Sequence, residues 1–132
     1  MIDGDRYLVG GIADKIPLDK CISEVCERIV VVLTRPKRFC MNEDMYYLSR
    51  LMCPRDKSLQ NAFRLRSRRY NERLSQIERL EAEGSIFVIR PSEPIALSRL
   101  EKDRSKIQAA YDMGCRDAQA LWPALESYLK HI

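Results

Sequence analysis

Basic side chains are concentrated between positions 55 and 73, where seven lysines and arginines stand against two acidic residues. The seven basic residues are Arg55, Lys57, Arg64, Arg66, Arg68, Arg69 and Arg73. Arginine binds phosphate through charge-assisted hydrogen bonds, so this cluster could hold the phosphate groups of a nucleic acid or of a lipid headgroup. The candidate residues for such an anion site are Arg64, Arg68 and Arg69.

A solvated helix face explains the same basic cluster without any ligand. Arg69 and Arg73 are spaced to form ion pairs with Glu72 and Glu78 on one helix. Only two aromatic residues are interleaved with the basic ones, and both fall on the expected buried side, whereas nucleic-acid sites stack bases on exposed aromatic rings. We therefore favour the solvated face, and we do not expect a nucleic-acid partner.

Other residue types that carry chemistry are sparse in this chain. Gly10-Gly11 precedes an expected helix, but the chain contains neither Gly-x-Gly-x-x-Gly nor Gly-Lys-Ser/Thr, so a phosphate loop is disfavoured. The five cysteines form no Cys-x-x-Cys pair, and the single histidine is His131. We expect no metal site, no cofactor and no histidine base, and we expect the thiols to be free and reduced. The cysteines are Cys21, Cys26, Cys40, Cys53 and Cys115.

Length and composition are typical of one globular domain. The chain has 132 residues, of which 45% are apolar and 32% charged, with a net charge of +4, and these values exclude disordered and collagen-like classes. The longest apolar run, residues 29–33, is far shorter than the ~20 residues of a membrane-spanning helix, so no membrane span is expected. Acidic residues near the N-terminus do not fit a secretory signal, and we expect a cytoplasmic protein.

The first forty residues predict a strand, a turn, a helix and a second strand. Residues 6–9 favour a short strand, and Gly10-Gly11 predicts a tight turn that needs a positive φ or a close backbone approach. Apolar residues recur at helical spacing over 18–27. The strand expected at 29–34 shows no polar alternation, which is typical of a parallel strand covered on both faces.

The remaining residues are expected to be mainly helical. Asn42 can cap a helix, and a longer helix over 56–83 is expected to end at Gly84. Its apolar stripe consists of Leu59, Phe63, Tyr70, Leu74, Ile77 and Leu80. A short strand follows at 85–90.

A final helical region is expected to begin after Asp103 as its N-cap. Gly114 and Pro123 are expected to bend or divide it. Its apolar face consists of Ile107, Tyr111, Cys115, Leu121, Leu125 and Leu129.

Several stretches of this chain resemble one protein family. Residues Tyr7–Pro17, which contain Val9-Gly10-Gly11, and residues Ile29–Pro36 resemble the carboxyl-terminal part of bacterial patatin-like phospholipases. Further stretches resemble the tail of the uncharacterised bacterial subgroup of that family, in the same order along the chain. These stretches are Arg69–Asn71, Glu81–Gly84, Val88–Pro94 and Ser98–Asp103.

The resemblance implies a serine lipid acyl hydrolase with a three-layer α/β/α fold. Such enzymes use a Ser-Asp dyad, with the serine in a Gly-x-Ser-x-Gly elbow, the aspartate in an Asp-Gly-Gly or Asp-Gly-Ala motif, and a glycine-rich oxyanion loop. The aspartate accepts the serine proton, so the dyad needs no histidine. The implied substrate of an intact family member is a lipid or another ester.

Two departures from the family pattern argue against activity of this chain. None of its ten serines lies in Gly-x-Ser-x-Gly, and Val9 occupies the position of the dyad aspartate. Asp14 is the nearest downstream carboxylate and only a weak candidate, because a displacement of ~1 Å in a catalytic group can cost about 10²-fold in rate. We expect Asp14 to bond backbone N–H groups of the turn instead.

The sequence therefore predicts an α/β fold with few, mostly parallel strands and several helices. Residues 1–40 are expected to form the end of a patatin-like catalytic core, and residues 41–132 a mainly helical region, together in one compact unit. We interpret the chain as a truncated lipid-degrading hydrolase that is inactive alone, with no intact catalytic residue. The alternative is a non-catalytic interaction or oligomerisation module, either a homo-oligomer or a partner of a separate N-terminal half.

Overall fold

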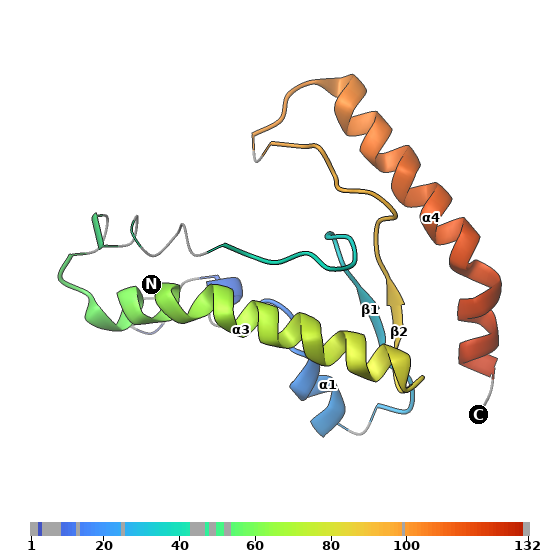
Figure 1. Cartoon of the computed structure of the whole chain (residues 1–132), viewed down its shortest axis with the longest axis horizontal. Helices are drawn as coiled ribbons and strands as arrows, with labels where there is room; N and C mark the ends of the chain where they lie inside the picture. The colour runs from blue at the N-terminus through green and yellow to red at the C-terminus, as the bar shows by residue number, and fades with distance from the viewer. Residues whose placement is uncertain are drawn as a thin grey trace. The chain divides into compact units, whose positions relative to one another are not determined.

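The chain has an α/β fold in which helices accompany a two-stranded parallel sheet (Figure 1). The computed structural model describes residues 3, 9–12, 14–24, 26–42, 47, 50–51, 54–98 and 100–130. In chain order the elements are the 3-10 helix η1 (Gly10–Ile12), α1 (Leu18–Ser23), β1 (Val30–Val32), α3 (Lys57–Ala82), β2 (Phe87–Ile89) and α4 (Arg104–Lys130).

The chain divides into two compact units, each assembled from two separate stretches. The first unit consists of residues 1–26 and 40–78, and the second of residues 27–39 and 79–132. The first therefore holds η1, α1 and most of α3, whereas the second holds the sheet, the last turn of α3 and α4. The division of function expected between residues 1–40 and 41–132 stays a prediction.

The two strands pair in parallel, in agreement with the sequence-based prediction. Val31 lies opposite Val88, and the pairing runs from Val30 with Phe87 to Val32 with Ile89. Both strands are shorter than the predicted 29–34 and 85–90. Two further backbone hydrogen bonds extend the pairing of β1 by one residue at each end: the Phe87 N–H donates to the Ile29 carbonyl, and the Leu33 N–H donates to the Ile89 carbonyl. Parallel strands need a long crossover, which the chain between the two strands supplies.

One face of this sheet is covered over both strands. Val31 and Val88 point to this face, and with their neighbours Leu33 and Ile86 they form its buried core. The ion pair between Arg90, which follows β2, and Glu81 in the last turn of α3 lies on the same side by the alternation of the strand.

The opposite face is covered over β2 but not over β1. Phe87 packs against Tyr128 of α4, with ring centroids 5.6 Å apart, and α4 lies beside β2 in Figure 1. On β1, Val30 and Val32 stay 38% and 69% exposed. The expectation that strand 29–34 is covered on both faces is therefore wrong for this chain, because α4 extends over only one of the two strands.

Helix α3 closely follows the sequence-based prediction for residues 56–83. All six residues of the predicted apolar stripe are buried or half-buried, and Ile77 is completely buried. The helix ends at Ala82, and Gly84 adopts a φ of +72°, the left-handed conformation that commonly ends helices at glycine. The predicted stop at Gly84 is confirmed.

Helix α4 begins as predicted but continues without a division. The Ser105 backbone N–H donates to Asp103 Oδ1 at 2.9 Å, which confirms Asp103 as the N-cap. Gly114 and Pro123, expected to bend or divide this region, lie inside a single helix of 27 residues and do not divide it, whereas a bend stays a prediction. No described helix is long and apolar enough to cross a membrane.

The apolar face predicted for α4 is only partly covered. Cys115, Leu121 and Leu125 are half-buried, but no residue of the helix is fully buried. The remaining members of the predicted face are exposed, since among the described elements α4 packs against only the short strand β2. These members are Ile107, Tyr111 and Leu129.

Three further expectations concern the N-terminal part of the chain. Gly10 and Gly11 do form a turn, but neither has a positive φ, and added Cβ atoms would meet at most Lys15 at an ordinary 3.8 Å, so the expected glycine requirement is wrong. The helix expected over 18–27 ends at Ser23. The strand expected at 6–9 and the helix expected after Asn42 fall mostly on residues outside those that the structure describes.

Ile77→Ala should lower the free energy of unfolding by about 2–5 kcal/mol, because it removes buried methylenes and leaves a cavity in α3's packed face. Ile107→Ala is the matched control, since Ile107 is 45% exposed in α4, and it should cost less than about 1 kcal/mol. Urea unfolding followed by circular dichroism measures both. Equal losses for the two variants would contradict the assigned core.

Candidate functional site

The Val9-Gly10-Gly11 motif forms a turn that is closed by backbone hydrogen bonds. The Ile12 N–H donates to the Val9 carbonyl at 3.1 Å, and the Asp14 N–H donates to the Gly10 carbonyl at 2.9 Å. The Val9 side chain is 74% exposed and therefore supplies no core packing. The position that the family resemblance assigns to an acidic proton acceptor thus carries an exposed apolar group.

Asp14 is used to shape the loop that follows this turn. Its Oδ1 accepts a hydrogen bond from the Ile16 N–H at 3.1 Å, the arrangement expected for this residue from the sequence. Its Oδ2 lies 3.9 Å from Arg73 Nη2. Among the described residues, no serine hydroxyl is hydrogen-bonded to Asp14, so the part of the chain described here assembles no Ser-Asp dyad around it.

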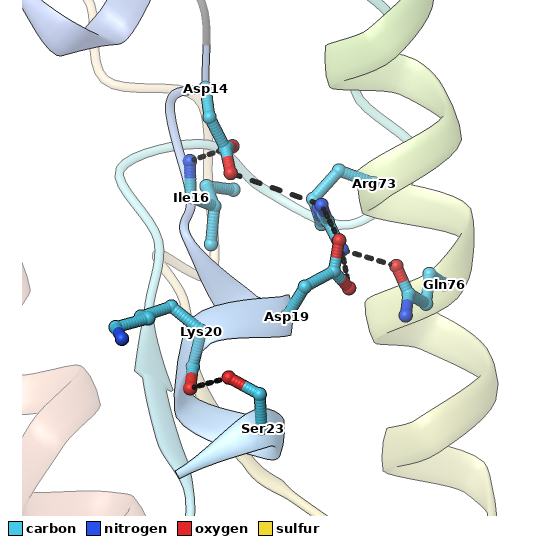
Figure 2. Close-up of polar contacts among 7 residues, drawn as sticks. All are labelled: Asp14, Ile16, Asp19, Lys20, Ser23, Arg73 and Gln76. Atoms are coloured by element: carbon cyan, nitrogen blue, oxygen red, sulfur yellow. Dashed lines mark hydrogen bonds and ion pairs between the residues drawn. The ribbon is translucent and has the colours of Figure 1, made fainter.

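Arg73 of α3 joins this loop and α1 to the long helix (Figure 2). Its Nη1 and Nη2 donate to Asp19 Oδ1 and Oδ2, each at 2.6 Å, and Nη1 also donates to Gln76 Oε1 at 2.6 Å. The Arg73 side chain is only 16% exposed. A two-pronged pair of this kind fixes orientation as well as distance.

The Arg73–Asp19 pair also changes the protonation equilibria of both groups. The hydrogen bonds from the Arg73 guanidinium hold the pKa of the Asp19 carboxyl below its ordinary value of about 3.8. The same hydrogen bonds raise the pKa of Arg73 further above its ordinary value. Both side chains are therefore charged at neutral pH.

An open cavity of about 380 Å³ lies between this loop and α3 within the first unit. Its lining includes Lys15, Asp19, Arg66, Arg69, Tyr70 and Arg73. Lys15 Nζ lies 4.6 Å from the centroid of the Tyr70 ring, a cation–π distance, and 3.4 Å from Met41 Sδ. Arg66 Nε donates to the Gly11 carbonyl at 3.4 Å, so it also connects α3 to the Val-Gly-Gly turn.

The structure separates the three arginines that the sequence suggested for an anion site. Arg64 bonds to Asn61 Oδ1, and Arg68 pairs with Glu72 at 2.8 Å on the exposed side of α3. Arg69 instead lines the cavity, and it makes no ion pair or hydrogen bond with any described residue. The expectation that Arg69 and Arg73 pair with glutamates on the same helix is wrong, because Arg73 is taken by Asp19 of α1.

Sequence reasoning missed Arg66 and Lys15 as members of a common site. Arg66, Arg69 and Arg73 stand at positions i, i+3 and i+7, which places them on one face of a helix. That spacing was available from the sequence alone. The contribution of Lys15 was not, because it depends on how the loop returns against α3.

The described residues form neither a disulfide nor a cluster of potential metal ligands. The described cysteines Cys21, Cys26, Cys40 and Cys115 are free, and no group of three or more potential metal ligands gathers among the described residues. Asn71 instead fixes the segment near residue 41, accepting from the Met41 N–H at 2.8 Å and donating to the Met41 carbonyl at 3.1 Å.

Comparison with known proteins places the chain in a family. Residues 56–130 match a family described as a domain of unknown function (DUF6363), and because this match covers more than half of the chain, the chain belongs to that family. No curated protein and no solved structure matches the chain. The match covers α3, β2 and α4, whereas the loop that forms the other wall of the cavity precedes it.

Asp19→Asn should lower stability at neutral pH and have little effect in strong acid. Because the pKa of folded Asp19 is below its unfolded value, the stabilisation by the Arg73 pair is present above about pH 3.8 and is lost as the pH falls through the lowered folded pKa. The urea midpoints of the wild type and the variant, measured at neutral pH and near pH 2, give the comparison.

Arg73→Gln and the double variant complete a cycle that isolates the pair. The coupling energy between the two substitutions, taken from the stabilities of the four proteins, should be present at neutral pH and should vanish near pH 2. A coupling that is independent of pH would show that the pair does not stabilise the fold through its charges.

Proposed function

We propose that this chain is the carboxyl-terminal portion of a patatin-like lipid acyl hydrolase, and that it is not catalytic by itself. In this role β1 and β2 belong to the central sheet of a larger three-layer α/β/α fold, and the nucleophilic serine, its elbow and the oxyanion loop come from another part of the complete enzyme. The substrate class of that enzyme is an ester of a lipid.

The uncovered face of β1 is the observation that carries this proposal. Parallel strands are normally covered on both faces, and a pair of strands is marginal without further strands. Here Val30 and Val32 remain exposed beside a face of β2 that is covered by Tyr128. A larger sheet with its own helices would cover these valines and supply the missing neighbour of β1.

The state of the motif residues supports the absence of catalysis. A Ser-Asp dyad needs a carboxylate that accepts the serine proton, and Val9 has no group that can accept one. Asp14 accepts a hydrogen bond from the Ile16 N–H and lies 3.9 Å from Arg73, so its carboxylate is engaged within the loop and with α3. No serine in the sequence has the flanking glycines of an elbow.

The purified chain should hydrolyse p-nitrophenyl butyrate no faster than a heat-denatured control, and it should not react with a fluorophosphonate probe of activated serines. Val9→Asp alone should also be inactive, because it restores the proton acceptor but not the serine. Turnover or labelling of the chain by itself would contradict the proposal that its catalytic machinery is incomplete.

Complementation tests the positive side of the proposal. The chain is coexpressed with the amino-terminal part of a bacterial patatin-like hydrolase that contains the serine elbow and the oxyanion loop. Ester hydrolysis should appear with the Val9→Asp chain and not with the native chain, since only the former completes a Ser-Asp dyad. Equal hydrolysis with both, or none with either, would count against membership in this enzyme class.

A second candidate function is a module that associates with another copy through β1. The same exposed valines favour it, because an uncovered strand pairs readily with another chain. In this second candidate the partner is another copy of the same chain, whereas in the first it is the remainder of a hydrolase.

Val32→Lys should separate these candidates, because a charged side chain on an exposed strand blocks edge-to-edge association. If copies associate through β1, light scattering should show a concentration-dependent oligomer in the wild type and a monomer in the variant. Ser98→Lys, on an exposed loop of the same unit, is the charge-matched control. A wild-type monomer at all concentrations would rule out the homo-oligomeric candidate.

A further inference from the structure

The cavity between α3 and the segment that precedes and begins α1 has one more basic than acidic side chain in its lining. Four basic and three acidic side chains line it. The acidic ones are Asp14, Asp19 and Glu72. Each lies within 4 Å of an arginine nitrogen: Asp19 and Asp14 of Arg73, and Glu72 of Arg68, an arginine that is not part of the lining.

Two arginines of α3 in the lining take part in no ion pair with any described residue. Arg69 makes no ion pair or hydrogen bond with any described residue, and Arg66 uses only its Nε, on the Gly11 carbonyl. The two terminal nitrogens of Arg66 therefore make no hydrogen bond or ion pair with any described residue. Lys15 of the loop also lines the cavity, with its ammonium over the Tyr70 ring and beside Met41 Sδ.

From this arrangement we infer that the cavity binds the phosphate group of a small phosphorylated compound. Phosphate oxygens accept several hydrogen bonds at once from guanidinium groups, and Arg66 and Arg69 supply two such groups from one face of α3. The Arg73–Asp19 pair does not contact the ligand in this assignment. It holds α1 and the preceding loop against α3, so that Lys15, Arg66 and Arg69 line one cavity.

The volume of the cavity extends the inference from a bare ion to a larger ligand. Sites for small molecules usually measure about 300–1,000 Å³, and about 380 Å³ is sufficient for a phosphate with a short organic group attached. The phosphate could belong to a soluble phosphomonoester or to a phosphatidic acid headgroup, which present the same chemistry. The inference does not depend on the proposed hydrolase origin, because none of the cations has a role in that chemistry.

Arg69→Gln should weaken binding of glycerol 3-phosphate and inorganic phosphate by about tenfold, the effect of losing one charge-assisted hydrogen bond. Arg64→Gln is the matched control, because it removes the same charge from the exposed side of the same helix, and it should leave affinity within about twofold. Isothermal titration calorimetry at low salt measures both. Arg68 is avoided as a control, since its loss would release Glu72 into the cavity.

A double substitution of Arg66 and Arg69 by Gln should abolish binding, and the corresponding change at Lys57 and Arg64 should not. Circular dichroism checks that each variant is folded; if the loss of the Arg66–Gly11 contact disturbs the fold, the single Arg69→Gln variant still decides the matter, because Arg69 contacts no described partner.

Vesicles of phosphatidylcholine containing phosphatidic acid distinguish the two sources of phosphate. Cosedimentation with these vesicles that depends on Arg69 but not on Arg64, without binding of glycerol 3-phosphate, would assign the site to a lipid headgroup. Binding of glycerol 3-phosphate with the same dependence would assign it to a soluble compound. Absence of binding in every arm, or equal weakening by Arg69→Gln and Arg64→Gln, would overturn the inference.

Discussion

The two-pronged ion pair between Arg73 and Asp19 is the interaction on which the first unit depends. α1 has only six residues and no side-chain cap at its N-terminus, so it is too short to be a stable helix alone. Arg73 holds it against α3 and at the same time approaches Asp14 in the preceding loop. Without this pair, the loop would be held to the helix only by longer contacts, those of Asp14 with Arg73, of Arg66 with the Gly11 carbonyl and of Lys15 with the Tyr70 ring.

The second unit is organised by a polar contact of a different kind. The Tyr128 hydroxyl accepts from the Ile29 N–H at 3.3 Å and lies 3.1 Å from the Ser85 carbonyl, while its ring packs against Phe87. One side chain near the end of α4 thus meets the backbone at the start of both strands. This contact helps to hold together a sheet of only two three-residue strands.

Much of the fold was predictable because local signals and packing agree. The stripe of α3, its stop at Gly84 and the Asp103 cap depend on residues close in sequence, and all three are confirmed. The errors arose where the outcome depends on distant partners. An uninterrupted run of β-branched residues could not reveal that only one face of β1 is covered, and helical spacing within α3 could not reveal that Arg73 pairs with α1.

The exposed side chain of Val9 belongs to a turn, Val9-Gly10-Gly11, that also lines the cavity through Gly11. A valine that is 74% exposed stabilises nothing by burial, so packing does not explain its presence at this position. An exposed position beside a turn is, however, where a reacting group must stand to meet a substrate. This agrees with the proposal that the chain is not catalytic by itself, because the exposed group at this position cannot accept a proton. Arg66 gives the turn a second role, because its bond to Gly11 makes the same backbone part of the cationic cavity. The turn therefore contributes to the inferred phosphate site, although Val9 has no group for the dyad chemistry.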